Sequence, residues 1–87
     1  MRAKISYLSL LRDVTQVKEE ILELPDGSTI RDLIFHLLKK YDGLKQFFEQ
    51  EENILITVNG EVISKMEMDK QIKDNSDIII GLPPFGG

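Results

Sequence analysis

Apolar and polar side chains alternate near the start of the chain, over residues 5–10, and this period of two predicts a first strand. Ile5 and Tyr7 share one face of that strand. Residues 12–16 are polar and predict a turn. Apolar residues then recur among Glu and Lys over residues 17–24, which predicts a second strand that returns as a hairpin, although Glu and Lys also favour a helix there.

The strongest periodic signal predicts a helix in the middle of the chain. Residues 25–27, Pro-Asp-Gly, predict a tight turn before it, and Thr29 followed by Asp32 resembles a capping box. The apolar residues that follow have the spacing of a single helix face: Ile30, Leu33, Ile34, Leu37, Leu38 and Tyr41. Because Asp42 and Gly43 then supply a stop signal, we expect the main helix to end near Tyr41.

The second half of the chain predicts short elements. Residues 44–52 suit a short second helix, and residues 54–59 suit a strand. Asn59-Gly60 is a strong signal for a two-residue hairpin, after which residues 61–63 return as a short strand. Met66 and Met68 are expected to fill gaps in the core.

The last predicted strand, residues 78–82, lacks polar alternation, which is expected for a strand flanked by strands on both sides. Asn75, in the turn before it, is expected to take the left-handed conformation. One amphipathic helix must cover one face of one sheet, and a right-handed crossover lets the final strand insert parallel to the first. The pattern therefore predicts an α+β, β-grasp (ubiquitin-like) fold, with a mixed sheet of four to five strands. A ferredoxin-like fold is the alternative, but it needs a second long helix.

Composition narrows the chemistry available to this 87-residue chain. Cysteine is absent, so thiol nucleophiles, disulfides and thiolate metal sites are excluded, and we expect no bound metal or cofactor. The single histidine, His36, lies off the apolar stripe and is expected to be solvated. A net charge of −4 argues against a nucleic-acid partner. Without a membrane-spanning stretch or a secretion signal, the chain is expected to be cytoplasmic.

The C-terminal tail, residues 83–87, carries the most specific signal in the chain. Its sequence is Pro83-Pro84-Phe85-Gly86-Gly87. The prolines end the strand and favour an extended path, and two glycines fit a channel too narrow for side chains. We therefore expect residues 1–82 to form the domain and residues 83–87 to form an exposed tail, whose terminal carboxylate at Gly87 can enter another protein's active site.

The chain resembles the MoaD and ThiS family of ubiquitin-like sulfur carriers, and it is most similar to the MoaD type. The resemblance covers nearly the whole chain in element order and is carried by these segments: the turn at 25–29, the hairpin at 58–61, the strand entry at 77–79, Pro83-Pro84 and Gly86-Gly87. It implies that Gly87 is adenylated with ATP by a separate MoeB-like activating enzyme. A sulfur donor then converts Gly87 to a thiocarboxylate.

The same resemblance implies a carrier subunit with no catalytic side chains of its own. Its sulfur would pass to a pterin within a larger, MoaE-like subunit of molybdopterin synthase, for the molybdenum cofactor. Gly86, without a side chain, would let the chain reach a narrow active site. Pro83, Pro84 and Phe85 would dock the tail on a partner or stiffen it, and the alternative for Phe85 is a side chain that folds back onto the domain. Three other functions stay open: conjugation to protein lysines as a ubiquitin-like modifier, sulfur delivery for tRNA or thiamine, and an interaction module with an inert tail.

Overall fold

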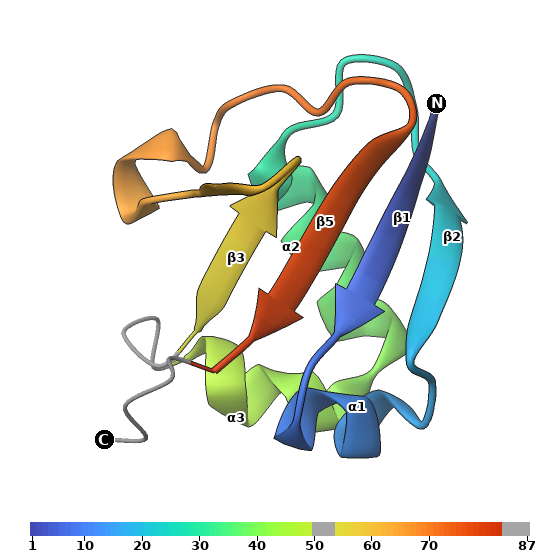
Figure 1. Ribbon diagram of the computed structural model, residues 1–87, viewed down its shortest axis with the longest axis vertical. Coiled ribbons are helices and arrows are strands. Elements are labelled where there is room, and N and C mark those ends of the chain that lie inside the picture. The colour runs from blue at the N-terminus through green and yellow to red at the C-terminus, as the bar shows by residue number, and fades with distance from the viewer. Residues whose placement is uncertain (50–53, 83–87) are drawn as a thin grey trace.

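A five-stranded mixed sheet with one long helix across a single face forms the body of the protein (Figure 1). The computed structural model describes residues 1–49 and 54–82. The strand order is β2-β1-β5-β3-β4. The elements in chain order are β1 (Arg2–Tyr7), α1 (Leu10–Thr15), β2 (Glu19–Glu23), α2 (Ile30–Lys40), η1 (Asp42–Leu44), α3 (Lys45–Phe48), β3 (Leu55–Val58), β4 (Glu61–Val62), η3 (Lys65–Glu67) and β5 (Ser76–Gly81).

The last strand lies in the middle of the sheet, as the sequence predicts. β5 runs parallel to β1 and antiparallel to β3, and the other pairings are antiparallel. Among the described residues, α2 has 11 residues, whereas α1 has six and α3 four, so the second long helix of a ferredoxin-like fold is not found there. The β-grasp prediction is confirmed.

The core lies between α2 and the sheet. Ile5 and Tyr7 of β1 and Ile78 and Ile80 of β5 face the helix, because alternate residues of a strand point to the same side. The helix contributes its predicted stripe, of which these residues are fully buried: Ile30, Leu33 and Leu37. Ile34, Leu38 and Tyr41 pack at its margins.

Local signals at the start of α2 and at two turns are confirmed. Asp32 N donates to Thr29 Oγ1 over 3.2 Å, and Thr29 N donates to Asp32 Oδ2 over 2.9 Å, which completes the capping box. Asn59 and Gly60 have φ of 51° and 86° in the β3–β4 hairpin. Asn75 has a φ of 63° just before β5.

The structure corrects two predictions, one for residues 8–16 and one for Met66. β1 ends at Tyr7, and residues 10–15 form the helix α1 where the sequence predicts the end of a strand and a turn. Leu11 of this helix is fully buried, so packing against the core overrides the local alternation. Met66 is 95% exposed on η3 rather than part of the core, whereas Met68 does pack against the core.

Candidate functional site

The tail begins at the end of the central strand, where the sheet holds the chain on both sides (Figure 1). Ile80 pairs with Tyr7 of β1, and Gly81 pairs with Leu55 of β3. The Leu8 amide also donates to the Ile80 carbonyl oxygen over 3.0 Å. Because β5 is bonded on both edges, the point from which the tail leaves the domain is fixed.

Each of the predicted site residues lies outside the described residues. This holds for Gly87, for Gly86 and for Pro83, Pro84 and Phe85. The structure therefore shows where the tail starts, at the half-buried Leu82, and which surfaces of the domain surround that point.

Gly81, the last residue of β5, lies in a close contact that the sequence reasoning missed. A Cβ built on Gly81 would lie 3.0 Å from Leu8 Cβ and 3.2 Å from Leu8 Cδ1, closer than ordinary van der Waals contact. Leu8 thus covers the last residue of β5, and a side chain at position 81 would require Leu8 to shift by a few tenths of an ångström. A glycine inside an apolar strand is the signal that could have indicated this close approach.

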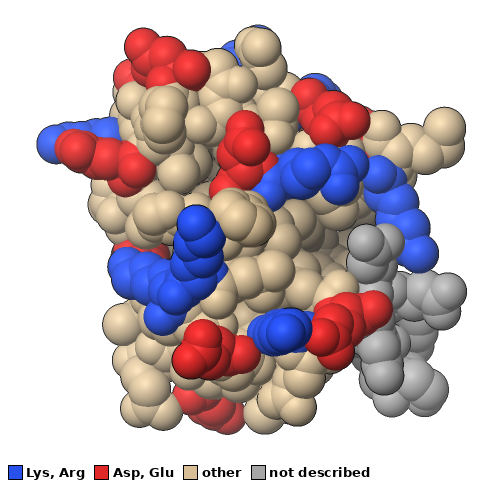
Figure 2. Space-filling model, turned by 180° about the vertical axis from the view of Figure 1, so that it is seen from behind, with Lys and Arg blue, Asp and Glu red and all other residues tan. Residues whose placement is uncertain are grey.

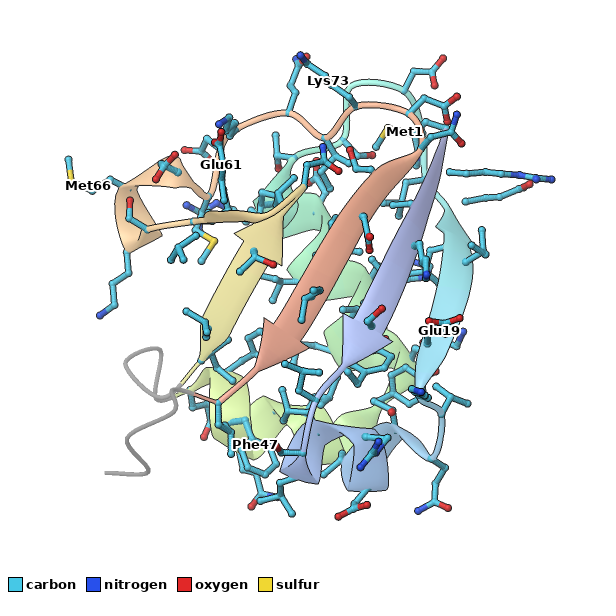
Figure 3. All side chains as sticks on the ribbon, viewed as in Figure 1. Met1, Glu19, Phe47, Glu61, Met66 and Lys73 are labelled. Carbon is cyan, nitrogen blue, oxygen red and sulfur yellow. The ribbon has the colours of Figure 1, made fainter. Side chains whose placement is uncertain are left out.

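The sheet face opposite α2, here called the outer face, carries exposed apolar side chains near the end of β1 and on β4, Leu8 and Val62. Val62, Thr57 and Ile79 lie side by side on β4, β3 and β5, according to the register. Val62 is 63% exposed. Leu8 covers Gly81 on the same face, and Figure 3 looks onto this face. Exposed apolar side chains such as Leu8 and Val62 suit contact with a partner protein.

A partly buried carboxylate ties β2 to the C-terminal end of α2. Glu20, whose side chain is 13% exposed, accepts hydrogen bonds from Tyr7 Oη at 2.7 Å, from Tyr41 Oη at 2.5 Å and from Lys40 Nζ. Burial raises the pKa of Glu20, but the hydrogen bonds from Lys40, Tyr41 and Tyr7 together outweigh burial and hold that pKa below its usual value.

Both tyrosines in this cluster stay protonated. Burial, followed by the hydrogen bond to Glu20, raises the pKa of Tyr7 and of Tyr41. The Glu20 carboxylate already accepts hydrogen bonds from the two tyrosines and from Lys40. We therefore infer that the cluster stabilises the fold and takes no part in a reaction. The sequence did not indicate it, since Glu20 reads as one more charged residue of a polar segment.

His36 is exposed on α2, as predicted. Within residues 1–49 and 54–82, His, Asp and Glu side chains form no group suited to a metal ion. In the same ranges, no helix combines the length and apolarity needed to cross a bilayer.

Comparison with known proteins decides the family. The model of the ThiS family matches residues 5–87, nearly the whole chain. The chain belongs to the ThiS family. The resemblance to carriers of the MoaD and ThiS type that the sequence indicated is thereby confirmed.

Individual proteins that are similar to this chain add to the ThiS-family match. A molybdopterin synthase sulfur carrier subunit from Chlamydomonas reinhardtii is 25% identical, covering 100% of this chain and 99% of that protein. A putative molybdopterin converting factor, subunit 1, from Pyrococcus furiosus superposes with a TM-score of 0.79 at 28% identity, covering 95% of this chain and 98% of that one. The small archaeal modifier protein 1 of Methanosarcina acetivorans gives a TM-score of 0.81 at 26% identity, covering 99% and 96%.

Proposed function

We propose that this ThiS-family protein is a sulfur carrier that acts as the small subunit of a molybdopterin synthase. The observation that carries the proposal is the sequence Gly86-Gly87 at the end of the chain, which residues 82–85 connect to the central strand β5, whose last residue is paired in the sheet. A full-length match to a protein named as such a carrier subunit supports it, as does the P. furiosus structure.

The reactive group is the main-chain carboxylate of Gly87. An α-carboxyl group has a pKa of about 3.3 to 3.7, so it is ionised at neutral pH. On an activating enzyme, one carboxylate oxygen attacks the α-phosphorus of ATP, pyrophosphate leaves, and an acyl-adenylate forms. Hydrosulfide from a sulfur donor then attacks the acyl carbon and loses its proton, and AMP leaves, so that a thiocarboxylate remains at Gly87 and carries the sulfur onward.

The domain's part is to present that carboxylate to two partners in turn. We assign Gly86 to the narrow approach to the reacting carbon, and Pro83 and Pro84 to stiffening the tail. The outer face beside the tail is the docking surface for the activating enzyme and for the larger synthase subunit. The net charge of −4 favours partners with a basic face.

Intact-mass measurement tests the proposal. The purified chain is incubated with an activating enzyme, ATP and a sulfur donor, and replacement of one oxygen by sulfur is expected. A chain that lacks Gly87 serves as the matched control and should keep its mass. An unchanged mass of the full chain, with an activating enzyme that modifies its own known carrier, would contradict the proposal.

A second candidate function is a protein modifier, favoured by the likeness to the M. acetivorans modifier protein. It uses the same acyl-adenylate, but a lysine amine attacks the acyl carbon, AMP and a proton leave, and an isopeptide bond forms. Bands of higher mass that contain this chain and survive denaturant would support it. Their absence from native cell extract, together with a thiocarboxylate on the free chain, would favour the sulfur carrier.

A further inference from the structure

One edge of the sheet is an unpaired strand. β2 stands at the end of the strand order with β1 on its inner side, and Figure 1 shows no other described helix or strand along its free side. Its five residues include no proline or lysine, which commonly block pairing at a sheet edge. Because β1 separates β2 from β5, this free edge is distinct from the strand that leads into the tail.

The hydrogen bonds to β1 show which backbone groups this edge offers. Tyr7 N donates to the Lys18 carbonyl oxygen over 2.9 Å, and Leu24 N donates to the Met1 carbonyl oxygen over 2.9 Å. Since hydrogen-bonded pairs alternate along an antiparallel ladder, every second residue from 18 to 24 bonds to β1. The residues between them point their N–H and C=O groups away from β1: Glu19, Ile21 and Glu23.

The side chains of the same three residues lie on the outer face. Ile21 is 60% exposed and stands between two glutamates. Lys4 Nζ lies 3.4 Å from Glu19 Oε2, and Arg2 Nε lies 3.5 Å from Glu23 Oε1. Each of these four side chains is at least 44% exposed, so the ion pairs are weak. Both carboxylates therefore remain open to a second cation.

A second copy of the chain fits this edge poorly. Two-fold pairing centred on Ile21 would bring two exposed apolar side chains together. The same register would set Glu19 of each copy directly opposite Glu23 of the other, and like charges directly opposite destabilise paired strands. A strand with Lys or Arg at those two positions keeps the apolar contact and replaces the repulsion by attraction.

The α2 side of the edge adds apolar contact without selecting a charge. Phe35 is 60% exposed and lines a hollow together with Leu24, the residue that follows β2. Asp32 and Lys39 line the same hollow, and basic and acidic side chains are interspersed over this side of the molecule (Figure 2). The two glutamates of the outer face therefore set the charge of a partner strand.

We propose that the free edge of β2 binds an extended segment of another protein, which adds an antiparallel strand with the pattern basic–x–apolar–x–basic. Its apolar residue exchanges both backbone hydrogen bonds with Ile21, and its basic residues lie opposite Glu19 and Glu23. Main-chain bonds hold the segment, and the charges select it. This interaction surface goes beyond the proposed carrier function and does not depend on it.

Nuclear magnetic resonance of the full chain, titrated with a synthetic peptide, tests the proposal. The peptide acetyl-Thr-Lys-Thr-Ile-Thr-Lys-Thr-amide carries the expected pattern, and a control peptide has glutamate in place of both lysines. At millimolar lysine peptide we expect the largest amide shifts, and slowed hydrogen exchange, at Glu19, Ile21 and Glu23. The glutamate peptide should bind roughly tenfold more weakly or worse, because both charge pairs become repulsive.

Substitutions separate the backbone from the charges. Ile21→Pro removes the central donor of the free edge without removing a bond to β1, a position where an edge strand tolerates proline, and it should abolish peptide binding. The double variant Glu19→Lys/Glu23→Lys, which changes only exposed side chains, should prefer the glutamate peptide. Val62→Thr is the matched control, because Val62 is 63% exposed on β4 at the opposite edge, and it should leave binding unchanged.

Three results would overturn the proposal, whether or not Ile21→Pro folds. One is the absence of amide shifts on β2 at millimolar lysine peptide. Another is a set of shifts centred on Leu8 and Val62 instead of β2. The third is an unchanged peptide preference in Glu19→Lys/Glu23→Lys. None of these results bears on whether Gly87 accepts sulfur.

Discussion

Replacing Glu20 by glutamine should destabilise the domain, because it removes the charge that three donors share. Tyr7 is fully buried, so its hydroxyl depends on Glu20 for a partner. Hydrogen bonds to charged groups contribute about 1.5–3 kcal/mol, and those between neutral groups about 0.5–1.5 kcal/mol. Glutamine keeps one acceptor oxygen and can offer its amide to a tyrosine oxygen. We therefore expect Glu20→Gln to cost about 1–2 kcal/mol, from the weakened tyrosine bonds.

The lysine in this cluster should contribute less than the tyrosines. The Lys40 side chain is nearly half exposed, and exposed ion pairs contribute about 0.2–1 kcal/mol. Lys40→Met is thus a matched control that should lower the free energy of unfolding by less than about 1 kcal/mol. Glu20→Ala should cost more than Glu20→Gln, because it leaves the buried Tyr7 hydroxyl without a partner.

Urea unfolding measures these differences directly. The slope for a small domain is about 1 kcal/mol per molar urea, so the midpoint of Glu20→Gln should fall by about 1–2 M at pH 7. The pKa of Glu20 is lower in the folded state, so its stabilisation is complete above the unfolded pKa of about 4.3 and is lost as the pH falls through the folded pKa. The two proteins should converge in strong acid. Equal stability at pH 7, or a gap that persists in strong acid, would refute this reasoning.

Three further substitutions test the fold around the site. Thr29→Ala removes the cap of α2 and should cost about 1 kcal/mol by urea unfolding, and no loss would mean that the capping box is unimportant. Gly60→Ala should lower the free energy of unfolding by about 1–2 kcal/mol. The whole loss would come from the backbone conformation, since the φ of Gly60 is 86° and a Cβ there meets no atom within 4 Å. Met68→Ala should lower the unfolding free energy whereas Met66→Ala should leave it within about 0.5 kcal/mol, and equal effects would contradict their different burial.

The fold could be predicted from the sequence where local signals and topology agree. The apolar stripe from Ile30 to Tyr41 and the Asn59-Gly60 turn each specify one structure. The central place of β5 followed from the handedness of the crossover and from the lack of polar residues at 78–80. These features depend on periodicity and backbone conformation, which short segments determine by themselves.

What the sequence could not indicate depends on contacts between distant segments. α1 forms because Leu11 reaches the core, although the segment around it alternates like a strand. Leu8 meets Gly81 only because β1 and β5 pair in parallel, and Glu20 meets Tyr41 only once β2 lies beside α2. In the candidate site, the sequence predicted the tail residues, and the structure added the surfaces that surround their point of departure.

The position of the sulfur is the most direct test of the proposed carrier function. After reaction with an activating enzyme, ATP and a sulfur donor, the chain is digested and its C-terminal peptide is fragmented in the mass spectrometer. We expect one sulfur in place of one oxygen at the carboxylate of Gly87, with every other peptide unchanged. A C-terminal peptide of unaltered mass, or sulfur found on any other residue, would contradict it.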